Sequence, residues 1–251
     1  IGEQIIRNKI AFDQIDVFHS TEDLIASGLL NSMSNSQILL KGARKYNFEK
    51  LVHTLENKTH RTQLEVNLDA IQHNLAYFKK EIGPKTKLMV MVKAFAYGTG
   101  SIEIATLLQN SGVDYLTVAY TDEGVYLRKH GIYVPIMVMN PNIEEFDKLT
   151  ENGLEPEIYS FELLKAIDEY GTQQGKNIKI HIKLDTGMKR LGFDSSEIEE
   201  LSENLAQMPH LWVASILSHL AAADSPHPAE FTEKQVATFK LAAAKIESKL
   251  G

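Results

Sequence analysis

The chain has 251 residues, of which 43% are hydrophobic and 24% are charged, as is typical of a globular protein with a sizeable core. It contains no cysteine, which excludes disulfides, thiolate metal sites and a cysteine nucleophile, and no metal site is expected. The formal net charge is −7 without a basic stripe, so nucleic-acid binding is not expected. No apolar run approaches the roughly 18 residues of a membrane span, and the polar start does not resemble a signal peptide. A cytoplasmic protein without membrane contact is therefore expected.

Residues 1–58 are expected to form a small α/β unit, which is too short for a full core of its own. Ser20, followed three residues later by Asp23, is typical of the N-cap of a helix. Apolar residues at spacings of three and four predict a second helix that begins at Phe48. The expected elements are a strand at 15–18, a helix from 20 to about 31, a strand at 37–40 and a helix at 48–55.

One segment of this unit, ILLKGARKYNFEKLV, resembles the carboxyl end of UDP-N-acetylmuramoyl-tripeptide–D-alanyl-D-alanine ligases, which close with an LxKGSR strand and a helix. The resemblance implies that residues 1–58 are the C-terminal part of a Mur-ligase-like domain, and that Lys41 and Arg44 derive from the ligase. It also implies that the chain comes from a fusion of an ATP-dependent ligase with a second enzyme. The alternative for both basic residues is that they are ordinary surface charges in a loop.

The second domain is expected to occupy residues 59–251, after a polar joint at 58–61. The stretch 64–68 alternates apolar and polar residues, which predicts a half-exposed strand. Asp69 is expected to cap a helix from Ala70 to about Ile82.

From Leu88 onward, short apolar runs alternate with helix-like segments, which predicts a parallel sheet with right-handed crossovers. Because no GxGxxG turn is present, the pattern favours a (β/α)8 TIM barrel over a dinucleotide-binding sheet. Only about six strands follow where a closed barrel needs eight, so we predict an incomplete barrel preceded by a small α/β segment. Strands are expected at 88–92, 115–119, 136–139, 157–159, 178–184 and 211–217, and helices from near 101, 122, 142, 161, 195 and 232.

The apolar strand expected at 88–92 leads directly into Lys93. Desolvation disfavours a lysine ammonium and lowers its pKa, and a neutral amine condenses with carbonyl compounds, so Lys93 is a Schiff-base candidate. The residue by itself leaves open that its side chain simply extends to solvent at the end of the strand.

Two further clusters follow strands of the expected barrel, where functional side chains gather. The first contains Lys183, Asp185 and Arg190, and the second contains His219. Taken alone, a buried Lys183–Asp185 pair, a surface arginine and a structural histidine are alternatives without catalytic function.

Three segments, VKAFAYGTG, KLDTGMKRLG and SHLAAAD, resemble the alanine racemase signatures VKANAYGHG, KxDTGMxRxG and THFAxAD, in the same order. Phe95, Thr99 and Ser218 depart from these signatures, where the family usually has Asn, His and Thr. The resemblance covers residues 60–251, and the clusters reinforce one another because their order and intervals match.

The resemblance implies a role for each matching residue. Lys93 carries the cofactor pyridoxal 5'-phosphate and serves as one catalytic base, and Tyr97 contacts the cofactor phosphate. Arg190 binds the cofactor's 3-oxygen and meets the substrate carboxylate, and His219 lies near the pyridine ring. Lys183, which is carbamylated in several racemases, holds Arg190 in place.

The implied reaction interconverts L- and D-alanine for peptidoglycan synthesis, in a homodimer whose second base is a tyrosine from the partner subunit's carboxyl-terminal domain. That domain is missing from this sequence, so the chain alone is expected to be inactive.

Other functions remain open at this point. The chain resembles, more distantly, barrels that carry pyridoxal phosphate without turnover, and racemases, decarboxylases or aldolases for other amino acids. A scaffold that only tethers the ligase is a further alternative.

Overall fold

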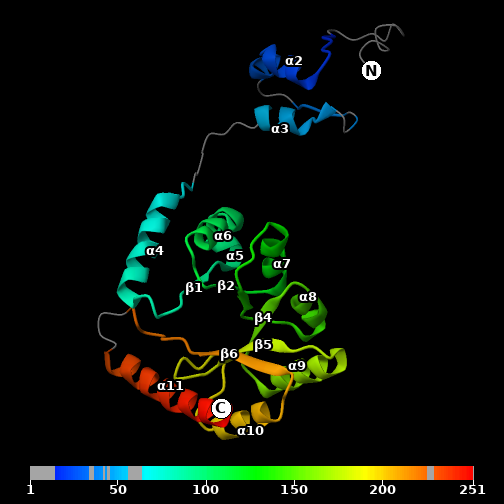
Figure 1. Ribbon diagram of the computed structural model, residues 1–251. Helices are drawn as coiled ribbons and strands as arrows, with labels where there is room; N and C mark the ends of the chain where they lie inside the picture. The colour runs from blue at the N-terminus through cyan, green and yellow to red at the C-terminus, as the bar shows by residue number, and fades with distance from the viewer. Residues whose placement is uncertain are drawn as a thin grey trace. The chain divides into compact units, whose positions relative to one another are not determined.

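The computed structural model describes residues 15–33, 37–41, 43, 46–55, 64–224 and 229–250 (Figure 1). The chain divides into two compact units, Ile1–Leu64 and Glu65–Gly251, which are described separately below. The boundary expected near residue 58 falls outside the described residues. Among the residues that are described, no helix combines the length and apolar character that a membrane crossing requires.

The first unit contains short helices. The Ser20 hydroxyl accepts a hydrogen bond from the backbone N–H of Asp23 at 3.0 Å, so the predicted N-cap is confirmed. The helix is shorter than predicted because Gly28 has a φ of 74° and ends it in the left-handed region. The helices are α2 (Thr21–Ala26), the 3-10 helix η1 (Leu29–Ser32) and α3 (Glu49–Leu55).

The two strands predicted in this unit are wrong. Residues 15–18 and 37–40 do not form strands, and all six strands of the sheet lie in the second unit. Leu39 is 86% exposed, so the apolar residues of its segment do not find a buried face. Lys41 is exposed, and Arg44 lies outside the described residues.

The second unit is built on one sheet of six parallel strands in the order β1-β2-β3-β4-β5-β6. Parallel neighbours need a crossover connection, and Figure 1 shows the connecting helices along the outer side of the strands. This sequential parallel order forms the wall of a (β/α) barrel, so the predicted fold class is confirmed. The strands are β1 (Met89–Met91), β2 (Tyr115–Val118), β3 (Ile136–Val138), β4 (Leu154–Ile158), β5 (Ile178–Lys183) and β6 (Leu211–Leu217).

Two apolar clusters form the core of this unit, one around β1 to β3 and one around β4 to β6. Leu116 on β2 and Ile180 on β5 are both 0% exposed, and each such side chain contributes about 1.5–3 kcal/mol of transfer free energy. The helices that cover these strands are α4 (Leu68–Ile82), α5 (Lys93–Tyr97), α6 (Ser101–Asn110), α7 (Thr121–Lys129), η3 (Ile143–Glu145), α8 (Phe146–Glu151), α9 (Phe161–Gln174), α10 (Ile198–Ala206) and α11 (Ala229–Leu250).

The start of this unit differs from the prediction. Residues 64–67 have no strand assignment, and α4 begins at Leu68. Its N-cap is Asn67, whose Oδ1 accepts the Ala70 N–H at 3.0 Å, whereas Asp69 lies in the first turn. The error has a simple origin, because an alternating pattern of five residues also suits a capped helix start, and an acidic residue is favourable at either position.

Two other boundaries were also misplaced. β4 begins at Leu154, before the predicted start at residue 157. The prediction was misled by Pro156, because prolines are rare inside central strands. Helix α10 begins at Ile198, after a turn over residues 195–197 that the sequence pattern had assigned to the helix.

Candidate active site

Lys93 lies just past β1 at the carboxyl edge of the sheet, separated from the strand by Val92. The preceding residue, Val92, still donates its N–H to the Thr117 carbonyl on β2 at 2.8 Å, so the backbone is fixed up to the lysine. Lys93 is half-buried, and no described residue hydrogen-bonds or ion-pairs with its amine. The amine is therefore free to react with a ligand at the mouth of the barrel.

The chain after Lys93 makes a left-handed helical turn, which the sequence did not predict. Residues 94–97 have φ values of 52°, 54°, 53° and 59°, and Gly98 follows at 82°. The Gly98 N–H donates to the Ala94 carbonyl at 2.9 Å, which closes the turn. Each left-handed residue other than glycine costs roughly 1–2 kcal/mol, so contacts elsewhere must hold this turn in place.

Glu123 of α7 provides those contacts. Its Oε1 accepts the Ala94 N–H at 2.6 Å, and its Oε2 accepts the N–H groups of Ala119 at 2.7 Å and Tyr120 at 3.2 Å. Hydrogen bonds to a carboxylate are stronger than those between neutral groups. One half-buried side chain thus joins the turn after Lys93 to the end of β2.

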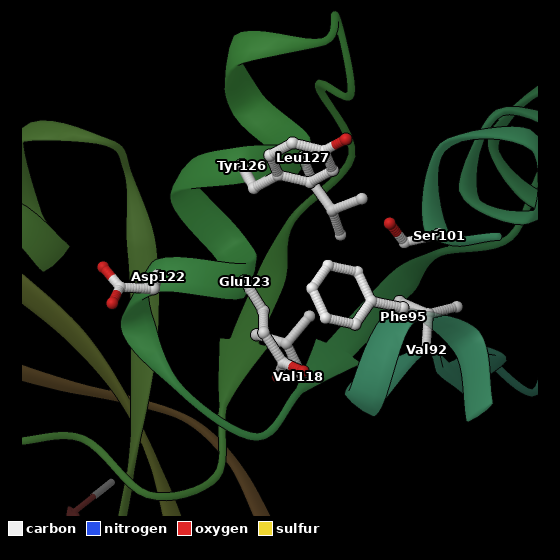
Figure 2. Close-up of a pocket in the computed structure, with 8 residues that line it drawn as sticks. All are labelled: Val92, Phe95, Ser101, Val118, Asp122, Glu123, Tyr126 and Leu127. Atoms are coloured by element: carbon white, nitrogen blue, oxygen red, sulfur yellow. The ribbon is translucent and has the colours of Figure 1, made fainter. Parts of the chain in front are cut away.

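The two aromatic residues of this turn, Phe95 and Tyr97, are 64% and 63% exposed. The Tyr97 hydroxyl donates to the Met91 sulfur at 3.1 Å, and because sulfur is a weak acceptor the phenol is available to a stronger one. Phe95 lies edge-on to Tyr126, with ring centroids 6.4 Å apart. Phe95 helps to line a hollow of about 250 Å³. Figure 2 shows its lining residues, which are Val92, Phe95, Ser101, Val118, Asp122, Glu123, Tyr126 and Leu127.

Lys183 at the end of β5 is buried, with 4% exposure. Its Nζ donates to Oε1 of Glu157 on β4 at 2.7 Å, and Glu157 is 0% exposed. Burial raises the pKa of the Glu157 carboxyl overall, although the hydrogen bond and charge of Lys183, and then the charges of His181 and Arg190, oppose that rise. Glu157 Oε2 is also buried and has no hydrogen-bond partner among the described residues.

The partner of Lys183 is therefore Glu157, and not Asp185 as the alternative interpretation of the sequence had it. Asp185 instead shapes the loop that follows β5, because its Oδ1 accepts the N–H groups of Gly187 at 2.9 Å and Lys189 at 3.0 Å. Burial raises the pKa of Asp185, but these two hydrogen bonds and the Lys189 charge outweigh it, so the pKa is lowered overall.

The same loop closes on itself and presents Arg190 on its exposed part. Phe193 donates its N–H to the Lys183 carbonyl at 2.9 Å, and its own carbonyl accepts the Asp185 N–H at 2.9 Å. Gly192 has a φ of 123°, and an added Cβ would come within 2.7 Å of the Asp185 nitrogen. Glycine is thus required for the backbone to pack this closely.

His219 lies in the exposed loop after β6. Gln235 of α11 is 1% exposed and holds this loop, because its Nε2 donates to the His219 carbonyl at 2.9 Å and its Oε1 accepts the Ala221 N–H at 3.0 Å. The same Nε2 lies 3.2 Å from Thr186 Oγ1 in the loop that carries Arg190. One buried amide thereby links the two loops.

Three of these residues, Glu123, Glu157 and Gln235, were not predicted from the sequence. Gln235 had a detectable signal, because it is a polar residue at helical spacing between Phe231 and Phe239. Glu123 and Glu157 had no detectable signal in the sequence. Glu123 accepts from backbone N–H groups and Glu157 accepts from Lys183, and only the fold brings these partners close. The structure links Lys183, the Arg190 loop and the His219 loop through hydrogen bonds, whereas no hydrogen bond or ion pair within the described residues joins them to Lys93 or Tyr97. Among the described residues, no cluster of three His, Asp or Glu side chains suits a metal ion.

The sequence profile of the family "Alanine racemase, N-terminal domain" matches residues 66–250. The chain belongs to the alanine racemase family. It is 34% identical to an alanine racemase of Synechocystis over 76% of this chain and 52% of that protein. It is 38% identical to an "Amino-acid racemase" of Enterococcus faecalis over 76% of this chain, but over only 26% of that protein.

Solved racemase structures have the same fold. An alanine racemase of Clostridium difficile in complex with cycloserine matches with a TM-score of 0.69 and 32% identity, over 76% of this chain and 54% of that one. One from Bartonella henselae, "with covalently bound pyridoxal phosphate", matches with a TM-score of 0.65 and 28% identity, over 72% and 52%. The chain thus spans about half the length of most of these relatives.

Proposed function

We propose that the protein carrying this chain is a pyridoxal-phosphate-dependent alanine racemase. The observation that carries the proposal is the half-buried Lys93, with an unpaired amine at the carboxyl end of β1 and a turn held by Glu123 behind it. The family membership and the covalently bound cofactor of the Bartonella henselae relative support it. A Bacillus anthracis relative with bound L-Ala-P, at 28% identity, supports alanine as the substrate.

The donor set of the chain fits the cofactor. The Lys93 amine suits the cofactor aldehyde, and the exposed Tyr97 phenol is a donor for its phosphate. Arg190 presents a planar fork for the ring oxygen and for the substrate carboxylate. His219 is exposed at the same edge of the sheet and is available to the ring. When bound, pyridoxal phosphate supplies the electron sink that acidifies the substrate Cα–H.

The protein's own task is to move one proton on each face of the substrate. The Lys93 amine accepts or returns the proton at Cα on one face, and Arg190 fixes the orientation of the carboxylate. A second base must act on the opposite face, and by family resemblance we assign it to a tyrosine of a second subunit in a homodimer. Lys93 is one of the two bases, and the other would come from a second subunit, so we expect residues 65–250 not to racemise alanine by themselves.

Replacement of Lys93 tests this proposal. In the full-length protein, Lys93→Ala should abolish racemisation, because it removes both the covalent attachment point and one base. Borohydride treatment of the wild-type holoenzyme should fix a pyridoxyl group on the peptide that contains Lys93. Lys87→Ala, at an exposed lysine just before β1, is the matched control and should keep activity. Recovery of the label on another lysine would refute the assignment.

A racemase for a different amino acid is the second candidate. It is favoured by the 38% identity to the Enterococcus faecalis protein, which is described as an amino-acid racemase. Turnover of alanine, serine and other amino acids by the full-length protein separates the two functions. If Lys93 is labelled but no amino acid is turned over, a cofactor carrier becomes the better interpretation.

We also infer that residues 1–58 are the C-terminal part of a ligase domain that adds D-alanyl-D-alanine to a peptidoglycan precursor. The support is the segment ILLKGARKYNFEKLV, at the end of which α3 begins. Such a fusion would unite production and use of D-alanine, and we place it in the cytoplasm, where ATP and the nucleotide-linked precursor occur. An assay of ATP-dependent ligation by the full-length protein tests the inference, and absence of ligation would contradict it.

A further inference from the structure

Glu157 is a buried carboxylate with only half of its hydrogen-bonding capacity in use. Its Oε1 accepts from Lys183, whereas its Oε2 is buried without a hydrogen-bond partner among the described residues. A buried charge is strongly unfavourable unless partners satisfy it. The free oxygen therefore indicates that another hydrogen-bond donor joins this pair when the site is complete.

Arg190 is the cation near Glu157 that remains available for this role. Its positive charge lowers the pKa of the Glu157 carboxyl and so opposes the effect of burial. Its exposed side chain offers five N–H donors. The nearby His181 is already engaged on both ring nitrogens, with Glu155 Oε2 at 2.9 Å and Ser215 Oγ at 2.7 Å. Arg190 also belongs to the loop that begins directly after Lys183, the last residue of β5.

We propose that Glu157 is a positioning residue for Lys183 and Arg190, with Oε1 holding Lys183 as an ammonium and the unpartnered Oε2 accepting a hydrogen bond from the Arg190 guanidinium. Lys183 then works without a carbamate. This inference rests on the proposed racemase function, because Arg190 is the residue that meets the substrate.

The chemistry of lysine carbamylation explains why Glu157 opposes it. A neutral Lys183 amine would attack the carbon of dissolved carbon dioxide, form an N–C bond, release one N–H proton to water and leave an N-carboxylate. That product would place a second negative charge beside Glu157 in a buried site and remove the ammonium that neutralises it. Glu157 also stabilises the protonated amine, which has no lone pair for the attack.

Carbon-13 NMR of the full-length protein in 13C-bicarbonate tests the inference without any need for turnover. The wild-type protein should show no carbamyl resonance. Glu157→Gln should gain one, because the amide no longer stabilises the ammonium, and the double variant with Lys183→Arg should lose it again. A wild-type carbamyl resonance that disappears in Lys183→Arg would overturn the proposal. Absence of a resonance in Glu157→Gln would equally remove Glu157 as the group that excludes the carbamate.

Kinetics test the positioning role. Glu157→Gln should lower kcat/KM for alanine by roughly 10- to 100-fold, since small misplacements of a binding group have effects of this size. Added bicarbonate should restore part of this loss, because a carbamate on Lys183 would replace the missing anion. Glu157→Asp should also restore part of it, and circular dichroism checks the fold of each variant.

Glu155→Gln is the matched control, because Glu155 lies on the same strand but binds His181. It should stay near the wild-type rate and show no response to bicarbonate. Equal losses in the two glutamine variants, or a wild-type enzyme that depends on bicarbonate, would overturn the proposal. A protein that racemises nothing would refute the proposed function instead, and the NMR experiment would still decide the state of Lys183.

Discussion

Arg190 and Lys183 are both basic residues, but Arg190 is exposed, whereas Lys183 is buried at the end of β5. Only the guanidinium offers a planar fork of N–H donors that suits carboxylate oxygens. We therefore predict that Arg190→Ala lowers kcat/KM of the full-length enzyme by about 100-fold and that Arg190→Lys recovers little of it.

Stability measurements provide the check on this prediction. An exposed substitution should change the free energy of unfolding by no more than about 0.5 kcal/mol. Lys189→Ala, at the exposed neighbour of Arg190, is the control for the loop and should retain most activity. Unchanged kinetics in Arg190→Ala would remove Arg190 from the site.

Asp185 gives the loop of Arg190 a predictable acid sensitivity. In the folded state its pKa is lowered below its ordinary value of 3.8, so the ionised carboxylate stabilises the fold above pH 3.8 and loses this effect as the pH falls through the folded pKa. Asp185→Asn should therefore be less stable than wild type at neutral pH, and the difference should shrink below pH 3.8. Urea unfolding over a pH series measures it, and a constant difference at every pH would contradict the assignment.

At the scale of single elements, Glu123 controls the conformation of the turn that follows Lys93. Glu123→Gln replaces an acceptor oxygen with an N–H₂ group that faces a backbone N–H, so at least one hydrogen bond is lost. We predict that it destabilises the protein by about 1–3 kcal/mol and lowers the borohydride-dependent labelling of Lys93. Glu144→Gln, at an exposed carboxylate in η3, is the control. Full stability together with full labelling in Glu123→Gln would show that the turn does not depend on this carboxylate.

The strands could be predicted from the sequence because each is a local apolar run buried by its neighbours. The run before Lys93 and the runs of β2 and β5 were found within about two residues, since parallel strands covered by helices favour continuous apolar residues. The same reasoning failed for residues 64–67, where the alternation belongs to a helix start.

The left-handed turn could not be predicted, because its four consecutive positive φ values go against local preference. They depend on the hydrogen bond from Ala94 to Glu123, which is distant in sequence. Glu157 was missed for a related reason. Its importance comes from strand register, which pairs Glu157 with His181 and brings Lys183 into reach from β5. Such pairings are properties of the sheet and leave no local pattern.

At the scale of the whole second unit, the sheet has β1 and β6 as its outermost strands. The inner strands β3 and β4 are buried along their whole length, whereas β6 is only partly covered. A hollow of about 490 Å³ runs along β6, bounded by residues that include Leu205 and Leu250. Such an edge invites pairing with another strand, from the same protein or from a second copy.

Trp212 on β6 reports on this edge, because it is the single tryptophan of the 251 residues and is 65% exposed. Its ring lies 5.4 Å from the Lys179 ammonium, which leaves its other face to solvent. We predict that the 251-residue chain fluoresces like a solvent-exposed indole and is strongly quenched by acrylamide, and that Trp212→Phe removes the signal. The measurement should be repeated over a range of protein concentrations. A blue-shifted emission that resists quenching at every concentration would show that β6 is covered within one copy, and a shift that grows with concentration would show that copies associate along this edge.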